Sequence, residues 1–569
     1  MIKFKKMKKH IILLLVMISI VGVSCSGEFD EVVPSADRPA DQVFNDIGLA
    51  RSFLSPAYSG VVRTPQLILE YNTSNAVSID GAQRTAVSGP TAESSPVNGR
   101  WGAAITNIFR INEFFERALG IQFDALNEDF GNALKNRLIG EAFGLRAYYK
   151  WVLLKNYAGP SSVDGSMLGI PIIDDLLTTE DVNNVARSSY LESYNSIKKD
   201  LDSAYARIDV LRYEGNDDIT GVQNTSRISR EMIWALRTRL DLFSASPAYG
   251  IITWEQAAQT AYEAIGVIDG GALKTLQDYG DFNNTDNPDH LWRRAFSEDS
   301  DLERQHYPPS MFGTGEANPS QNLIDAFPDS NGYPINHPNS IYNGLNPYQN
   351  RDARFENFVF YNGENDFRNV TIETFNGGSD AVGGVRIRGT RTGYYLKKFL
   401  SSNVSLDPDS PGANKDFKVF ALFTRAGLYL DFAEAAVEAY GINGSDGSMT
   451  FTAKDALAIV RDRNISNDLY LDIADDFLNS YRDLIRNERR IEFAFEGEYF
   501  YDIRRWMLPL GELTVPVRGM DIVKETDGSF SYSEKTIEAR NFTDRMYYNP
   551  LPRTEVLKSN ALIQNAGWE

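Results

Sequence analysis

The stretch LIRNERRIEFAFEGEYFYDIRRW, residues 484–506, lies within a predicted helical segment and is dense in arginine and glutamate. Glu488, Glu492 and Glu496 are four residues apart, so an α-helix would place them on one face. Like charges on one face repel each other, and the arginines of the same stretch are expected to neutralise them. We therefore predict a structural ion-pair network made of Glu488, Arg489, Glu492, Glu496, Arg504 and Arg505.

An acid/base role for these glutamates is the alternative. A glycosidase needs only two carboxyl groups that face each other across a sugar bond. The same stretch also contains Ile491, Phe493 and Phe495, which favour burial against neighbouring elements over an open cleft. We favour the structural role and keep a secreted glycosidase that uses Glu488 and Glu492 as the less favoured hypothesis.

Amphipathic helices are predicted on both sides of this stretch. Within residues 136–157, apolar side chains recur at alternating spacings of four and three, which is one helix face. Further helices are predicted over residues 190–208, 229–245, 253–268, 421–440, 452–464 and 475–506. Alanines at 257, 258, 261 and 264 would let a partner helix approach closely. Such helix pairs resemble tetratricopeptide repeats, although no strict 34-residue period is present.

The middle of the chain has a different composition. Residues 273–412 are rich in Asn, Gly, Pro and Tyr, with short strands predicted over 357–361 and 384–388. We divide the chain into an N-terminal helical region, 42–272, and a second region, 273–569, that joins this middle to C-terminal helices. The predicted fold is mainly α, a tetratricopeptide-like helix-pair scaffold with a loop-rich insertion region that contains small strands.

Charge and cysteine content exclude several classes of protein. The 569 residues include 77 acidic and 57 basic side chains, for a net charge of −20. This balance disfavours nucleic-acid binding, which needs a cationic footprint. The single cysteine excludes an intramolecular disulfide and Cys-rich zinc sites.

The amino terminus has the pattern of a secretory signal. Five lysines within residues 1–10 precede an apolar run at 11–23, which is too short to span a bilayer. We predict a signal peptide over residues 1–24 and lipidation of Cys25, the only cysteine, followed by a tether over residues 25–41. A plain signal-peptidase site beside an incidental Cys25 is the alternative.

Motifs for catalysis or metal binding are missing from the sequence. His290, His306 and His337 are scattered through the loop-rich middle, with no HExxH and no Ser-His-Asp order. Residues 407–412 begin like a calcium loop, but its twelfth position is Lys418 and not the required Glu. We predict no catalytic residue, no metal site and no cofactor.

Several segments together carry a family resemblance. Residues 484–506 contain Arg-x-Glu-Arg-Arg-x-Glu, then Glu-Gly, then Asp-Ile-Arg-Arg-Trp. In the same chain order stand GEA at 140–142, RAYY at 146–149, SQNLIDAF at 320–327, FAEA at 432–435, NPLP at 549–552 and QNAGW at 564–568. Over most of its length the chain resembles the SusD/RagB family. It departs from the family pattern at Glu498-Tyr499, where a basic residue is common, and at Ala566, where Pro is usual.

The resemblance implies a function. Family members are surface lipoproteins, anchored in the outer membrane by an N-terminal lipid, that capture oligo- or polysaccharides for a SusC-like TonB-dependent transporter. RagB-like members capture peptides, so peptide cargo is an alternative. A binding role is expected, without catalysis, a cofactor or a nucleic-acid partner.

Aromatic side chains in loops are the candidates for sugar contact, since their ring faces stack on sugar C–H groups. Trp101 either forms such a platform or packs on the helix that follows it. Trp292 is expected to be structural. The predicted ligand-binding set is Tyr71, Asn72, Arg100, Trp101 and Tyr307.

Overall fold

The computed structural model describes residues 51–569 apart from 119–122, 124–126, 269–272, 274–286, 296–297, 410–413, 466 and 474–477. The predicted signal peptide, Cys25 and the tether over residues 25–41 lie outside the described residues.

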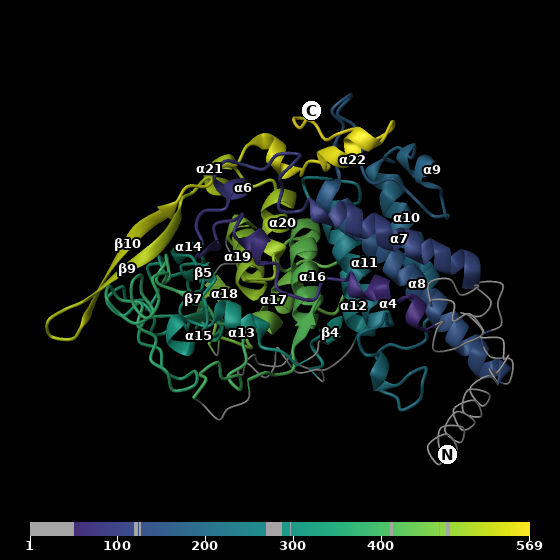
Figure 1. Ribbon diagram of the computed structural model, residues 1–569. Helices are drawn as coiled ribbons and strands as arrows, with labels where there is room; N and C mark the ends of the chain where they lie inside the picture. The colour runs from purple at the N-terminus through teal and green to yellow at the C-terminus, as the bar shows by residue number, and fades with distance from the viewer. Residues whose placement is uncertain are drawn as a thin grey trace, which may run out of the picture.

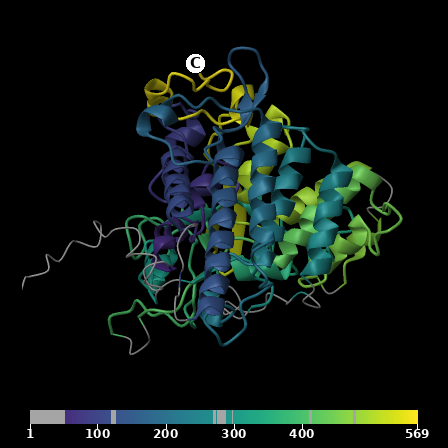
Figure 2. The same cartoon turned by 90° about the vertical axis from the view of Figure 1, so that its right-hand side faces the viewer.

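A row of long helices forms the scaffold, as predicted. They are α7 (Gly99–Ala118), α8 (Glu128–Tyr157), α10 (Tyr190–Tyr205), α11 (Arg230–Ala245), α12 (Trp254–Val267), α16 (Arg425–Tyr440), α17 (Ala453–Arg461), α19 (Leu478–Glu492) and α20 (Glu498–Arg505). Along the row, α7 packs on α8, α8 on α10, α11 on α12, α12 on α16 and α16 on α17. Figure 2 shows the helices of this row side by side, from purple and blue through teal to green.

Local sequence signals account for where several of these helices begin. Ser189, Thr253 and Thr452 each cap a helix and form a capping box with the residue three positions later. Close packing follows the distribution of small residues: the predicted alanines of α12 are at most 2% exposed, and they face α16, which is itself rich in buried alanine. The mainly α, helix-pair fold class is confirmed.

Short elements surround the scaffold (Figure 1). The short helices are α4 (Ser55–Ser59), α5 (Leu67–Glu70), α6 (Arg84–Val87), α9 (Thr179–Asn183), α13 (Asp301–His306), α14 (Gln321–Ile324), α15 (Ala353–Phe358), α18 (Leu469–Ile473), α21 (Leu510–Leu513) and α22 (Arg553–Lys558). The strands form antiparallel pairs: β1 (Ala76–Ser78) with β5 (Ala317–Pro319), β2 (Gly159–Pro160) with β3 (Met167–Leu168), β4 (Arg293–Ala295) with β8 (Val419–Ala421), β6 (Val359–Phe360) with β7 (Tyr395–Leu396), and β9 (Val517–Lys524) with β10 (Phe530–Glu538).

Two predicted elements differ in the structure. Residues 384–388 form no strand, because the backbone N–H groups of Gly384 and Val385 bond to nearby carbonyls and close turns. The predicted helix over 475–506 is two helices, α19 and α20, because Phe495 and Gly497 adopt left-handed backbone angles between them. At Gly497 a Cβ atom would also lie 2.8 Å from the Cβ of Gln66, so this sharp turn requires glycine.

The β9–β10 hairpin was not predicted, and it extends away from the body on the left of Figure 1. The Asp527-Gly528 pair at its tip, with Gly528 at a φ of 87°, is a turn signal that the sequence does carry. The division of the chain at residues 272 and 273 stays a prediction.

Candidate functional site

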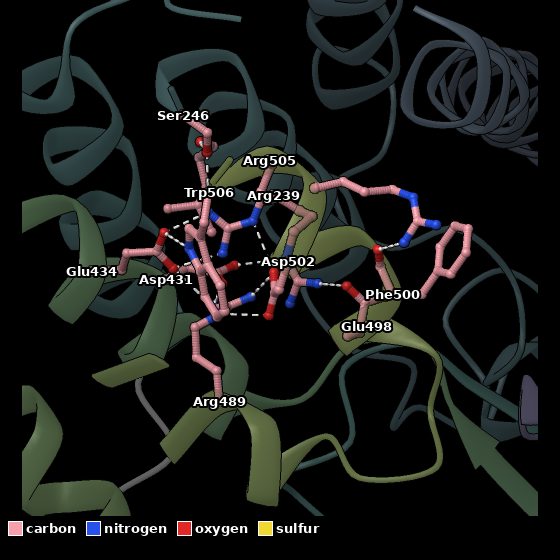
Figure 3. A network of polar contacts seen from close by, with 12 residues as sticks. Arg239, Ser246, Asp431, Glu434, Arg489, Glu498, Phe500, Asp502, Arg505 and Trp506 are labelled. Atoms are coloured by element: carbon pink, nitrogen blue, oxygen red, sulfur yellow. Dashed lines mark hydrogen bonds and ion pairs between the residues drawn. The ribbon is translucent and has the colours of Figure 1, made fainter. Parts of the chain in front are cut away.

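Most of the charged side chains between residues 488 and 505 are buried in a network of ion pairs, part of which is shown in Figure 3. Arg489 is fully buried and its guanidinium contacts three carboxylates, those of Asp431, Glu434 and Asp502. Arg505 pairs with Asp502 at 2.8 Å and with Glu434. The structural role predicted for this stretch is supported by these contacts.

The partners of the glutamates differ from those predicted. Glu488 accepts hydrogen bonds from Arg354 at 2.6 Å and from Arg461 at 2.9 Å. Glu492 accepts from Arg354 at 3.0 Å and from Arg463 at 2.6 Å. The neutralising cations therefore come from distant segments of the chain, while the arginines of α19 and α20 pair with acids of α16 and α20.

Glu496 and Arg504, two members of the predicted network, have other positions and partners than predicted. Glu496 lies in the turn after α19, off the helix face of the other two glutamates, and pairs with Lys398 at 2.8 Å. Arg504 has no carboxylate partner among the described residues. It donates to the carbonyl of Phe500 at 2.7 Å and stacks on that ring. Burial lowers the pKa of Arg504 to about 9.

Glu498, where the chain departs from the family pattern, also has a structural role. Its carboxylate pairs with Arg239 and lies 3.7 Å from the ammonium of Lys155. Because Glu488 and Glu492 are buried with both oxygens held by arginines, neither carboxylate can reach a sugar bond in this structure. The glycosidase hypothesis for this pair therefore loses its geometric basis.

The structure contradicts Trp101 and Tyr307 as sugar platforms, since both rings are in the core. Trp101 is 4% exposed and packs edge-on against Tyr157 of α8, with ring centres 5.2 Å apart. Tyr307 is fully buried, and its hydroxyl donates to the carbonyls of Ser401 and Val404. Trp292 is also buried, as expected. A ring can be a stacking platform only if a face is open to the ligand.

The other three predicted residues lie near one surface cleft. Tyr71 is in its wall. Arg100 lies behind the wall, where its guanidinium donates to the side-chain oxygen of Gln66, whose amide nitrogen in turn holds the carbonyl of Thr64 at 2.7 Å. Asn72 is half-buried and caps the carbonyl of Ile68 at 2.8 Å, which leaves it outside the lining. Arg100 thus positions the cleft wall without facing the cleft.

This cleft has a volume of about 820 Å³ and lies between the segment Arg63–Tyr71, which includes α5, and helix α13. Its lining is largely polar: Thr64, Gln66, Gln83, Gln305, Asp299, Asp301 and Glu316 are all part of it. Burial and the nearby charge of Asp80 raise the pKa of Glu316. The volume is that of a typical ligand site, and the side chains offer both donors and acceptors.

Two buried polar atoms in the cleft wall have no hydrogen-bond partner among the described residues. One is the hydroxyl of Tyr71, which is 4% exposed, and the other is Nδ1 of His306, which is 1% exposed. Burial raises the pKa of Tyr71 and lowers that of His306 to about 3, so both side chains are neutral near pH 7. An unsatisfied buried polar group costs about 1–3 kcal/mol, so a ligand that supplied the missing partners would be stabilised at this wall. Other unpartnered side-chain atoms occur elsewhere in the described residues, and this wall differs in having two of them beside a polar cleft.

His306 was not among the predicted binding residues, although its neighbour Tyr307 was. His306 is the last residue of α13 and lines the cleft, whereas Tyr307 follows the end of the helix and lies outside the cleft lining, although both side chains are buried. No three His, Cys, Asp or Glu side chains of the described residues cluster as a metal site would require. Within the same part of the chain, none of the helices has the length and apolarity to cross a bilayer.

Comparison with known proteins identifies the family. A family model described as "SusD family" matches residues 272–568, and a model described as "Starch-binding associating with outer membrane" matches residues 47–214. No curated protein matches the chain.

Solved structures share the fold. A SusD-like protein from Bacteroides fragilis is 24% identical, with 93% of this chain and 98% of that chain covered and a TM-score of 0.73. A SusD-like carbohydrate binding protein from the same species is 18% identical, with 91% and 99% covered and a TM-score of 0.71. A laminarin binding SusD-like protein is 17% identical, with 92% and 99% covered and a TM-score of 0.58. The family model spans more than half of the chain, and the resemblance read from residues 484–506 is confirmed: this protein belongs to the SusD family.

Proposed function

We propose that this protein is a glycan-binding surface protein that captures oligo- or polysaccharide in the cleft between Arg63–Tyr71 and α13. The observation that carries the proposal is the pair of unpartnered polar atoms, Tyr71 Oη and His306 Nδ1, in the wall of one polar cleft. A sugar presents many hydroxyl groups, each of which donates and accepts. Both atoms are buried in the wall, so one ligand would satisfy them once the two side chains turn toward the cleft on binding. Membership of a family whose members include carbohydrate-binding proteins supports the same reading.

Delivery of the captured glycan to a SusC-like TonB-dependent transporter is the second part of the proposal. The protein would be held at the outer membrane by lipid on Cys25, and the description of the second family model, which names outer-membrane association, supports that location. Binding without turnover is proposed, since the carboxylate pair first considered for catalysis is buried in ion pairs. Incubation with a retained polysaccharide should release no sugar.

Tyr71→Phe tests the cleft. The hydroxyl has no partner within the described protein, so its removal should leave the melting temperature unchanged or slightly raised. One lost hydrogen bond to the ligand should weaken binding about two- to tenfold. The measurement is retention on a panel of starch, laminarin and other polysaccharides with a parallel panel of peptides, followed by calorimetry with the glycan retained.

Tyr307→Phe is the matched control, because it removes the same atom from a tyrosine whose hydroxyl is satisfied inside the core. It should lower the free energy of unfolding by about 1–3 kcal/mol and leave affinity unchanged. Equal affinity of Tyr71→Phe and the unmodified protein would reject the cleft. Retention of peptides and not of polysaccharides would favour the RagB-like alternative.

Cys25→Ala tests the anchor. Stable membrane attachment by lipid takes more than one acyl chain, all of which would be lost with this cysteine. We expect the variant to leave the outer-membrane fraction and appear in the soluble fraction, as judged by immunoblotting of fractionated cells. A variant that still sediments fully with the outer membrane contradicts lipidation at this residue.

A further inference from the structure

Helix α13 separates the cleft from a second hollow. On one side Leu302 and His306 line the cleft, and on the other Ser300 and Arg304 line a recess of about 460 Å³. At 100° per residue, side chains two positions apart point to nearly opposite sides of a helix, so α13 is a ridge with a hollow on each flank. The far wall of the recess contains Phe312, Ser405 and Asp407.

Phe312 is an aromatic ring held at the surface at an energetic cost. It is 48% exposed, and its φ of 68° lies in the left-handed region, which is unfavourable for a non-glycine residue. The neighbours hold this conformation: its carbonyl accepts from Arg386 at 3.1 Å, and its N–H donates to the carbonyl of Pro309 at 3.0 Å. Met311, one residue earlier, is buried. The turn therefore places the ring of Phe312 at the recess, although burial of the same ring in the core would have stabilised the fold more.

The recess also has the polar groups that a sugar needs. The Oγ atom of Ser405 is buried and has no hydrogen-bond partner among the described residues. The guanidinium of Arg304 is held in place by Ser300 at 2.6 Å and by Asp301, and Asp407 supplies a carboxylate. An exposed ring face beside an unpaired hydroxyl and a fixed charged group can stack on the C–H face of a sugar and bond its hydroxyls.

We infer that the recess is a second sugar subsite and that one oligosaccharide crosses α13 to occupy the cleft and the recess together. The inference rests on the proposed function. A helix with its side chains is about 10 Å across, so a ligand must extend past that width to reach both hollows. A disaccharide then fills the cleft alone, while a longer oligomer gains the contacts at Phe312. Chain length of the glycan, and not only its sugar type, is what the two hollows select.

The test compares two lengths of ligand. Calorimetry with maltose and maltohexaose, and with laminaribiose and laminarihexaose, is run on the unmodified protein, Phe312→Ala and Phe312→Gly. Loss of the ring should weaken hexasaccharide binding about three- to tenfold and leave disaccharide binding unchanged. Phe312→Gly also removes the backbone strain, so it should be at least as stable as the parent, and its weaker binding cannot be attributed to misfolding. Phe312→Tyr should retain hexasaccharide affinity.

Ile387→Ala is the matched control, since Ile387 is 88% exposed and lines neither hollow. Equal losses for both ligand lengths, or no loss with either Phe312 variant, would overturn the second subsite. If Tyr71→Phe weakens both lengths while the Phe312 variants weaken neither, the proposed function stands and this inference fails. If the unmodified protein binds neither the malto- nor the laminari-oligosaccharides, two ideas are rejected for these glucans: their capture in the cleft and the second subsite in the recess.

Discussion

Replacing Arg354 with methionine is expected to lower the free energy of unfolding by about 3–5 kcal/mol. Arg354 is fully buried and pairs with Asp352 at 2.7 Å, Glu488 at 2.6 Å and Glu492 at 3.0 Å. Methionine fills much of the same space, but it leaves three buried carboxylates with fewer cations. The cost arises mainly from those uncompensated charges, because desolvated ions are stable only when they are paired.

Urea denaturation followed by circular dichroism measures this change. Arg553→Met is the matched control, since Arg553 forms a single pair with Glu93 in which both side chains are more than half exposed. That pair should contribute at most about 1 kcal/mol. If the two variants lose similar stability, the network around Arg354 does not hold the fold together as described.

Acid is expected to destabilise the protein through Glu492. Burial alone would raise the pKa of this carboxyl above 4.5, the ordinary value for glutamate. The positive charges of Arg463, Arg354 and Lys398 outweigh burial and lower the pKa to about 2. A group whose pKa is lower in the folded state stabilises the fold above its unfolded pKa, and that stabilisation is lost as the pH falls through the folded value. Ionised Glu492 contributes about 3 kcal/mol to the free energy of unfolding near neutral pH, and about 1.4 kcal/mol of this is lost by pH 3.5.

The comparison of the protein with Glu492→Gln over pH 6 to 3.5 isolates this contribution. Glutamine cannot titrate, so the stability of the variant should fall less steeply, by about 1.4 kcal/mol over this range. Other carboxylates titrate in both proteins and cancel in the difference. Parallel stability curves for the two proteins would show that Glu492 is not held ionised by its arginines.

Helix positions were predictable because their signals are local. The predicted ranges 229–245 and 253–268 agree with α11 and α12 to within one residue at each end, because apolar periodicity marks both helices and Thr253 also caps the start of α12. The single helix predicted over 475–506 failed because periodicity does not report backbone angles. Only the left-handed turn at Phe495 and Gly497 separates α19 from α20.

The candidate site was predictable only in part. Tyr71 was found from its loop position, and it does line the cleft. Tyr307 and His306 are neighbours in one short segment and both are buried, and composition cannot say which of them lines the cleft. Phe312 cannot be identified from the sequence, because nothing in a sequence shows that the backbone of a turn holds a bulky ring exposed.

The sequence alone was sufficient for the family, the helical scaffold and the existence of a charge network, because helical spacing and motif order are properties of neighbouring residues. The tertiary structure was needed for the identity of the ion pairs, since Arg354 and Glu488 are 134 positions apart in the chain. It was needed for the cleft for the same reason: residues 63–71 and 299–306 meet there only after the chain has folded. Ion pairing and burial depend on contacts between distant segments, and those contacts are made by packing and not by local sequence pattern.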